Sequence, residues 1–191
     1  MILVIDTSST IAVAGTIDEK GLMSEISRPS RDPAFMADLR HIAHENKITK
    51  VAVATGPGSF TGLRKGVSFG LGLAIGLKIP IIPLRTLELQ AARSDQPVTA
   101  ISEAGRGRFY YLVPGGDVAL GEPAEIPTAH QLVGIVSPAA EASLEKAGHH
   151  FNPKSGLRPL VAAAAQLLKT AREVPYDSLK LEYMQTFSAS K

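Results

Sequence analysis

The sequence predicts a mixed α/β protein built from two related halves. Short apolar runs of strand length alternate along its 191 residues with longer segments of helical periodicity. Their order in the first half is β-β-β-α-β-α-β-α, and the second half repeats that order incompletely. Apolar residues make up 45% of the chain, which is enough for a packed core.

The first half, residues 1–95, is predicted to hold five strands and three helices. Its first strand is apolar throughout, which suits a central position buried on both faces. Right-handed crossovers between the parallel strands give a mixed sheet with helices on both faces, the arrangement of a ribonuclease-H-like unit. The expected strands are residues 2–5, 11–17, 22–26, 50–54 and 79–84. The expected helices are residues 32–47, with Asp32 as N-cap and Pro33 in the first turn, 60–77 and 86–93.

The second half, residues 96–191, reads as a smaller, degenerate repeat that follows the polar turn residues 94–97. Its expected strands are residues 98–101, 108–113 and 134–136, with 118–120 as a further strand if it pairs. Three helices are expected: a short one with Thr128 and Gln131 as capping box, one from Ser137 to Gly148, and an alanine-rich one over residues 160–172. We expect the last helix to pack between the halves or on the first, and residues 181–184 to form a last ordered segment.

The predicted helix over residues 60–77 is unusual because five glycines lie inside it. Each glycine costs a helix interior about 1 kcal/mol relative to alanine, so five cost about 5 kcal/mol of helix propensity. At about 100° per residue, Gly62, Gly66 and Gly70 share one side. A glycine face lets another backbone approach closely, and the approaching group could be a phosphate, a neighbouring helix of the same chain or another protein.

Asp6, Thr7 and Ser8 end the first strand where it enters a hairpin, which makes them a candidate phosphate loop. A carboxylate there can orient hydrated Mg²⁺, while hydroxyl and amide groups hold phosphate oxygens. The alternative is a turn that only caps the strand. An autonomous nucleotide-dependent phosphotransferase also needs a second acidic loop and a glycine-rich adenosine motif, and neither follows Val98. Hydrolysis by this chain alone is therefore not expected.

No other side chains form a convincing catalytic or metal-binding set. His41, His44 and Glu45 have the one-turn spacing of zinc ligands but point away from the apolar stripe of their helix, so we predict no metal. The loop at residues 56–62 fits neither a Walker nor a dinucleotide fingerprint. Ser59 is explained as a helix N-cap and not as a nucleophile, because the Gly-x-Ser-x-Gly elbow is absent.

The composition narrows the class of protein further. There is no cysteine, which excludes disulfides and thiolate metal sites. The net charge is +2 without a dense Lys/Arg stripe, so we do not expect nucleic acid to bind by charge alone. No signal peptide is evident, and the longest uncharged apolar run, residues 66–77, is too short to span a bilayer. We expect a cytoplasmic protein without membrane contact.

One motif is more specific than these patterns. The nine residues Gly56, Pro57, Gly58, Ser59, Phe60, Thr61, Gly62, Leu63 and Arg64, preceded by Ile5-Asp6-Thr7-Ser8, closely resemble the signature of the TsaB (YeaZ) family. The second half departs from that family's pattern: Ser102–Arg106 stands where members carry Asp-Ala-Arg, and residues 181–185 keep little of their Pro-x-Tyr-x-Arg.

The resemblance implies an actin-like fold of two duplicated halves and a subunit without catalysis of its own. Members support the formation of N6-threonylcarbamoyladenosine at position 37 of tRNA by pairing with a catalytic TsaD-like subunit, and a TsaE-like ATPase joins the assembly. The chain would then meet tRNA indirectly, through the complex. It would need no cofactor when isolated, although ATP or ADP could bind at a partner interface.

The glycine-faced helix is our predicted pairing surface. Its interface residues would be Gly62, Gly66, Phe69, Gly70 and Leu73, together with the helix at residues 33–47. The helix is apolar nearly all round, so one face can enter the core and the other needs a cover. The cover is either a TsaD-like subunit or, in a homodimer, a second copy of this chain.

Overall fold

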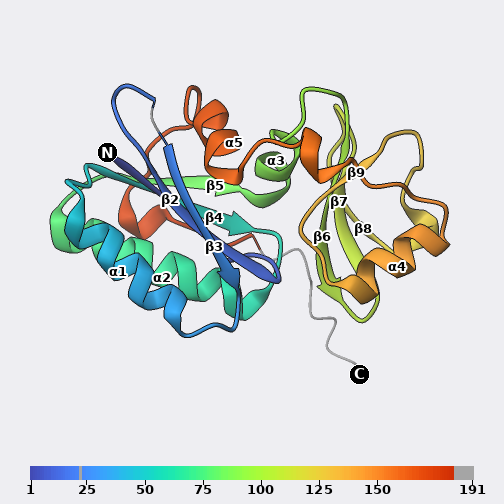
Figure 1. Cartoon of the computed structure of the whole chain (residues 1–191), viewed down its shortest axis with the longest axis horizontal. Helices are drawn as coiled ribbons and strands as arrows, with labels where there is room; N and C mark the ends of the chain where they lie inside the picture. The colour runs from blue at the N-terminus through green and yellow to red at the C-terminus, as the bar shows by residue number, and fades with distance from the viewer. Residues whose placement is uncertain (22, 183–191) are drawn as a thin grey trace.

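The computed structural model describes residues 1–21 and 23–182, which form two β-sheets lying side by side (Figure 1). The first is a five-stranded sheet of order β3-β2-β1-β4-β5 and the second a four-stranded sheet of order β8-β7-β6-β9. The second sheet repeats the strand order of the first without a fifth strand. The expected duplication of a mixed sheet, with a reduced second copy, is confirmed.

The first sheet consists of β1 Ile2–Asp6, β2 Ile11–Ile17, β3 Met23–Pro29, β4 Lys50–Gly56 and β5 Ile81–Arg85. Strand β1 pairs antiparallel with β2 and parallel with β4, as the expected meander and crossovers require. The associated helices are α1 Ala34–Glu45, α2 Phe60–Leu77 and α3 Thr86–Ala91. The expected strands and helices are all present, with boundary shifts of a few residues; Leu22, which we expected to open β3, lies outside the described residues.

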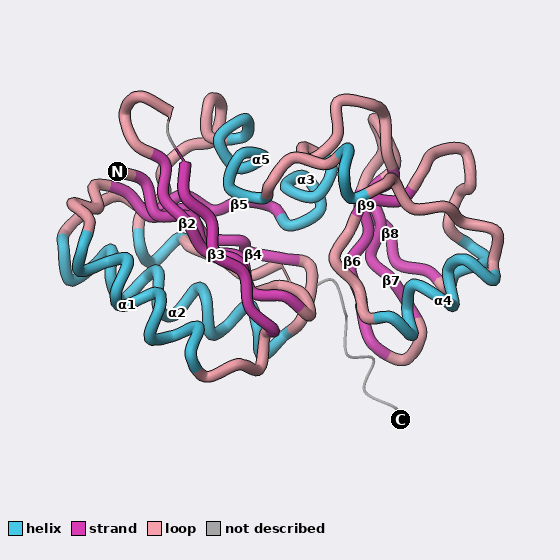
Figure 2. Tube along the Cα trace, in the orientation of Figure 1, coloured by secondary structure: helices cyan, strands magenta, loops and turns pink. Residues whose placement is uncertain are grey.

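Successive side chains of β1 point to opposite faces of the sheet, and their apolar character explains why helices cover both faces. Leu3 and Ile5 point to the face covered by α1 and α2, where Phe35 and Leu39 are fully buried. Val4 points to the other face, which is covered by α3 and by α5 Leu160–Leu167. Figures 1 and 2 show α1 and α2 together on one side of the sheet and α3 and α5 on the other. The central strand is therefore buried on both faces, as its apolar sequence predicts.

The second sheet consists of β6 Thr99–Gly105, β7 Arg108–Leu112, β8 Val118–Gly121 and β9 Leu132–Val133. Its short 3₁₀ turns are η1 Pro123–Glu125 and η2 Lys154–Gly156. One face packs on α4 Pro138–Lys146 through Ile101, Phe109 and Leu144. Ala100 and Tyr110 face the other way and pack with Leu87 of α3. Helix α3 thus joins the two sheets.

The chain then returns to the first half. Helix α5 packs on the first sheet, one of the two expected positions, but it ends at Leu167, five residues before the predicted 172. The following segment contains η3 Tyr176–Ser178 and runs along β5, where Val174 N donates to Ile81 O at 3.0 Å. Farther on, Glu182 N donates to Thr55 O at 2.8 Å. Residues 183 and 184 of the predicted last segment lie outside the described residues.

Two predictions for the second half are wrong. Thr128 and Gln131 do not begin a helix; the capping box that forms is between Glu122 and Glu125, around η1. The expected strand at residues 134–136 lies two residues earlier, at β9, because Gln131 O already accepts a hydrogen bond from Thr99 N at 2.9 Å. A capping box needs a helical apolar pattern after it, whereas β-branched residues follow Gln131.

None of the described helices is both long and apolar enough to cross a membrane.

Candidate functional site

The glycine face of α2 lies against this chain's own first sheet. A Cβ atom added at Gly62, Gly66 or Gly70 would come closer than 3.0 Å to the carbonyl oxygen of Thr7, the hydroxyl of Thr7 and the side chain of Val53, respectively. All three glycines are buried. The prediction that they form a surface for a partner's backbone is therefore wrong, because β1, β4 and the loop after β1 already occupy that space.

The other predicted interface residues lie differently on α2. Phe69 and Leu73 are half-buried and pack against the core under α1 and α2. Gly72 and Gly76 are exposed, and an added Cβ at either position would meet nothing within 4 Å. The open glycines of the helix are thus its two C-terminal ones, which the predicted interface did not include.

Several polar groups of the loop after β1 form hydrogen bonds within the loop or to the start of α2. Asp6 Oδ1 accepts a hydrogen bond from Ser8 N at 2.8 Å, and the hydroxyl of Thr7 donates to Gly62 O at 2.6 Å. Ser59 N donates to Ser8 O at 2.7 Å. Asp6, Thr7 and the loop before α2 are thereby fixed at one end of the sheet.

Two buried polar atoms of this loop have no hydrogen-bond partner within the described residues: Asp6 Oδ2 and Ser8 Oγ. Asp6 is 1% exposed, and burial raises the pKa of its carboxyl above the ordinary value, while the polar groups of Ser8 and the more distant charge of Arg93 oppose the rise. An orphaned carboxylate oxygen is costly inside a protein. The carboxyl is therefore more readily protonated than a solvent-exposed aspartate.

The sequence of the loop before α2 explains the conformation of its backbone. Gly56 has φ = 113°, a conformation that disfavours any side chain, and the bond to Pro57 is cis. A Cβ at Gly58 would come closer than 3.0 Å to Ser8 O. Ser59 caps α2 by accepting a hydrogen bond from Gly62 N at 3.3 Å, which confirms its predicted role. The signature residues therefore serve to start α2 beside the loop after β1.

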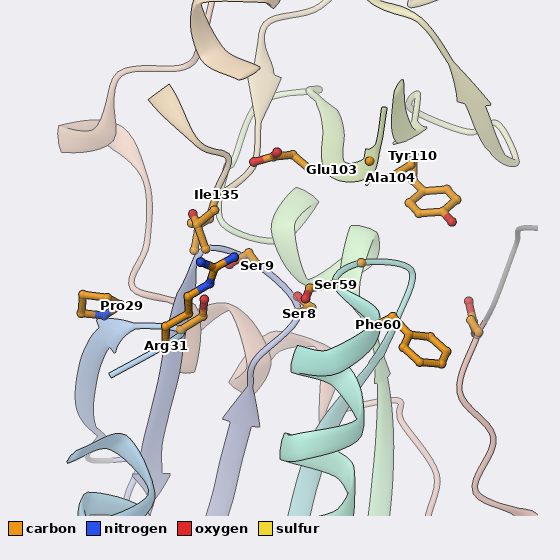
Figure 3. A pocket seen from close by; sticks show the side chains of 15 residues that line it. Ser8, Ser9, Pro29, Arg31, Ser59, Phe60, Glu103, Ala104, Tyr110 and Ile135 are labelled. Atoms are coloured by element: carbon orange, nitrogen blue, oxygen red, sulfur yellow. The ribbon is translucent and has the colours of Figure 1, made fainter. Parts of the chain in front are cut away.

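These two loops form one end of a cleft of about 610 Å³ between the two halves. Figure 3 shows Arg31 on one side, Phe60 and Tyr110 on the other, and Ser8 and Ser59 between them. The second half contributes the wall opposite these serines, from the end of β6, the middle of β7 and the segment after β9. Its lining residues are Glu103, Ala104, Gly105, Tyr110 and Ile135.

Both carboxylates that line the cleft are already engaged. Glu103 accepts hydrogen bonds from Ser137 N at 2.5 Å and Ser137 Oγ at 3.3 Å, at the N-terminus of α4. Glu182 pairs with Arg85, whose Nε lies 2.8 Å from Glu182 Oε1. The charge of Glu182 is thus compensated by Arg85, whereas Glu103 keeps its negative charge and is held in place by neutral donors.

Phe60 stands at the edge of this cleft with 47% of its surface exposed. The guanidinium carbon of Arg64 lies 3.7 Å from the centre of its ring, close enough for a cation–π interaction. Sequence reasoning placed Phe60 and Arg64 in the signature loop but did not foresee that they stack.

Of the predicted site residues, the structure brings together Asp6, Thr7, Ser8 and residues 56–59. His41 and His44 are exposed on α1. Within residues 1–21 and 23–182, no group of three or more metal-ligating side chains is close enough to hold an ion. The opposite wall of the cleft was missed because its residues are more than 90 positions from the first loop and show no local motif.

Comparison with known proteins assigns the family. The family model described as TsaD, tRNA N6-adenosine threonylcarbamoyltransferase, matches residues 40–137, about half of the chain and including the whole signature loop. Curated TsaB proteins of the tRNA threonylcarbamoyladenosine pathway are similar over shorter stretches. The chain belongs to the TsaD family.

The similarity to the TsaB proteins covers only part of the length of each of them. The protein of Bacillus subtilis strain 168 is 42% identical over 66 residues, which cover 33% of this chain and 29% of the relative. That of Escherichia coli K12 is 46% identical over 69 residues, covering 34% and 30%. The Buchnera aphidicola protein is 30% identical over 101 residues, covering 49% and 48%. The chain thus spans less than half the length of these TsaB proteins.

The fold is shared with two solved structures over nearly the whole chain. A Pseudomonas aeruginosa protein described as similar to peptidase YEAZ superimposes with a TM-score of 0.72 at 20% identity, covering 96% of this chain and 99% of its own. The structure titled YeaZ from the same organism gives 0.71 at 19% identity. The predicted fold class is confirmed by this likeness.

Proposed function

We propose that this chain is a non-catalytic subunit of the machinery that forms N6-threonylcarbamoyladenosine in tRNA, and that it pairs with a TsaD-like catalytic subunit. The observation that carries the proposal is the family assignment, since the matching curated proteins are named for the biosynthesis of this nucleoside. A TsaE-like ATPase would join the pair, and the site of action would be the cytoplasm, where tRNA is modified.

The loop after β1 supports an accessory role over catalysis. A phosphate held there would need the hydroxyl of Thr7 and the amides of the loop before α2. In this chain Thr7 Oγ1 donates to Gly62 O and Ser59 N donates to Ser8 O. These donors are already committed to joining the two loops. The chain would accordingly need no nucleotide of its own, and ATP or ADP would belong to a site shared with a partner.

The surface that supports pairing is the C-terminal half of α2. Ile75 is 50% exposed and Leu77 is 49% exposed, although both are large and apolar. At about 100° per residue, Gly72 and Gly76 lie on the same side of the helix as Ile75, in open space, whereas Leu77 points away from Ile75. Exposed apolar side chains next to glycines permit close approach of a second helix. We place the TsaD-like partner on this surface, which we name the α2 outer face (Gly72, Ile75 and Gly76), and a second copy of this chain is the competing occupant.

Reconstitution tests the proposal. A TsaD-like enzyme with its other pathway proteins is supplied with unmodified tRNA, with or without this chain, and the modified nucleoside is measured by mass spectrometry. We expect product only when the chain is added. Equal product without it would refute the accessory role. Micromolar binding of ATP and Mg²⁺ by the isolated chain, lost in Asp6→Ala, would instead favour an autonomous phosphotransferase.

A further inference from the structure

The cleft between the two halves is lined by polar, cationic and aromatic side chains that the proposed accessory role does not require. Its volume of about 610 Å³ falls within the range of small-ligand sites. Hydroxyl-bearing residues of its lining are Ser8, Ser9, Thr10, Ser30 and Ser59. Figure 3 shows Arg31 on one side and, on the other, the half-exposed Phe60 beside Tyr110, which is only 5% exposed. The buried Ser8, 1% exposed, has an Oγ atom that lacks a partner within the described chain.

We propose that this cleft binds an unpaired nucleotide of an RNA strand, so that the chain contacts RNA itself. A nucleotide joins a flat base to an anionic phosphate through a polar sugar. The exposed ring of Phe60 suits the base, the hydroxyl groups suit the sugar, and Arg31 suits the phosphate. This inference rests on the proposed function, because it names RNA as the ligand, and goes beyond an indirect role in the complex.

The charges around the cleft support this orientation. Arg31 is exposed and makes no ion pair with any residue in 1–21 or 23–182, whereas the carboxylates of Glu103 and Glu182 are held by Ser137 and Arg85. Figure 3 shows the guanidinium of Arg31 directed between Ser9 and Ile135. A phosphate near Arg31 would thus meet a guanidinium that no carboxylate of residues 1–21 or 23–182 already pairs with.

The position of Phe60 favours a strand over a free nucleotide. Phe60 lies at the mouth of the cleft, half exposed and stacked with Arg64, so the nucleotides on either side of a bound base can continue outward. Arg106 is exposed in the turn between β6 and β7, next to Gly105 of the lining. Arg31 thus lines the cleft, Arg64 contacts its Phe60, and Arg106 follows its Gly105 along the chain, so three separate elements carry arginines near it.

Fluorescence anisotropy with a labelled single-stranded oligoadenylate tests the site on the purified full chain. We expect the wild type to bind and Phe60→Ala to weaken binding at least about fivefold, since loss of one stacked base by alanine substitution has about that effect or more. Phe60→Trp should bind like the wild type because it keeps a stacking surface. Arg31→Gln should weaken binding and reduce the slope of log affinity against log salt by about 0.7, the value for one phosphate of a single strand.

Two matched variants serve as controls. Met23→Ala removes an equally exposed apolar side chain from the start of β3, and Arg40→Gln removes an exposed arginine from α1. Both should bind like the wild type. Thermal melting of every variant by circular dichroism shows that a loss of binding is not a loss of fold.

Three results would overturn the proposal: no binding by the wild type, equal weakening by the control variants, or AMP binding as tightly as the oligonucleotide. The last result would assign the cleft to a free nucleotide. Co-purification of Phe60→Ala with the TsaD-like subunit is measured in parallel. Retained pairing with lost RNA binding supports the cleft as an RNA site, and a wild type that pairs without binding RNA overturns only this inference and leaves the accessory role intact.

Discussion

The packing of α2 predicts opposite effects for the same substitution at two glycines of one helix. At Gly62, an alanine Cβ would come closer than 3.0 Å to the carbonyl oxygen of Thr7, a backbone atom that cannot rotate away. Overpacking a core costs about 1–3 kcal/mol, and the immobile obstacle favours the upper end of that range. The gain in helix propensity returns up to about 1 kcal/mol. We therefore expect Gly62→Ala to lower the free energy of unfolding by about 2 kcal/mol.

Gly72 is the matched control in the same helix. An added Cβ there meets nothing within 4 Å, so only the propensity gain remains. Gly72→Ala should raise the free energy of unfolding by about 0.5–1 kcal/mol. Equilibrium unfolding in urea measures both variants against the wild type. A Gly62→Ala protein as stable as the wild type, or a Gly72→Ala protein that is clearly destabilised, would refute this account of α2.

Three further predictions follow from particular contacts. Gly76→Arg should remove co-purification with the TsaD-like subunit without unfolding the chain, because it places a charge on the α2 outer face; the exposed Arg172→Ala after α5 is the control, and unchanged pairing would remove the partner from that face. Burial raises the pKa of Asp6, so the folded state holds the carboxyl proton more tightly than the unfolded state does. The free energy of unfolding should therefore fall as the pH rises from the ordinary carboxyl pKa through the raised pKa of the folded state. Asp6→Asn should abolish this part of the pH dependence in urea titrations, and an unaltered profile would show that Asp6 is not its source. Glu103→Ala should destabilise the chain by about 1–3 kcal/mol, because Ser137 N loses its charged acceptor at the start of α4; a thermal melt equal to that of the wild type would contradict the capping role.

The first half could be predicted closely because its signals are local. Helix α2 begins and ends where the sequence indicates, since Ser59 supplies the N-cap and Lys78 takes the left-handed conformation at the C-cap. Strand β2 also matches its predicted bounds, and β1 differs by one residue. Each of these elements has an uninterrupted pattern with clear ends.

The direction of the glycine face could not be predicted in the same way. The spacing of Gly62, Gly66 and Gly70 correctly indicated that another backbone comes close, but a helix that is apolar nearly all round does not reveal which side enters the core. The approaching groups come mainly from Thr7 and Val53 of the same chain. Only the three-dimensional arrangement separates these buried glycines from the open ones at positions 72 and 76.

The cleft was only half predictable for a related reason. Asp6, Thr7, Ser8 and the signature loop are marked by the strand ends that carry them, and they lie together as parallel strand ends should. Glu103, Tyr110 and Ile135 belong to the second half, and their place in the cleft depends on how α3 joins the two sheets. A sequence pattern confined to one segment carries no information about such a long-range arrangement.

The modified nucleoside in cellular tRNA tests the central claim most directly. The gene for this chain is depleted in its own host, and N6-threonylcarbamoyladenosine is quantified by mass spectrometry of digested tRNA, with wild-type chain and Gly76→Arg supplied back in parallel. The account predicts that the nucleoside falls on depletion, returns with the wild type and does not return with Gly76→Arg. A level that stays unchanged on depletion would contradict the claim that this chain serves the pathway.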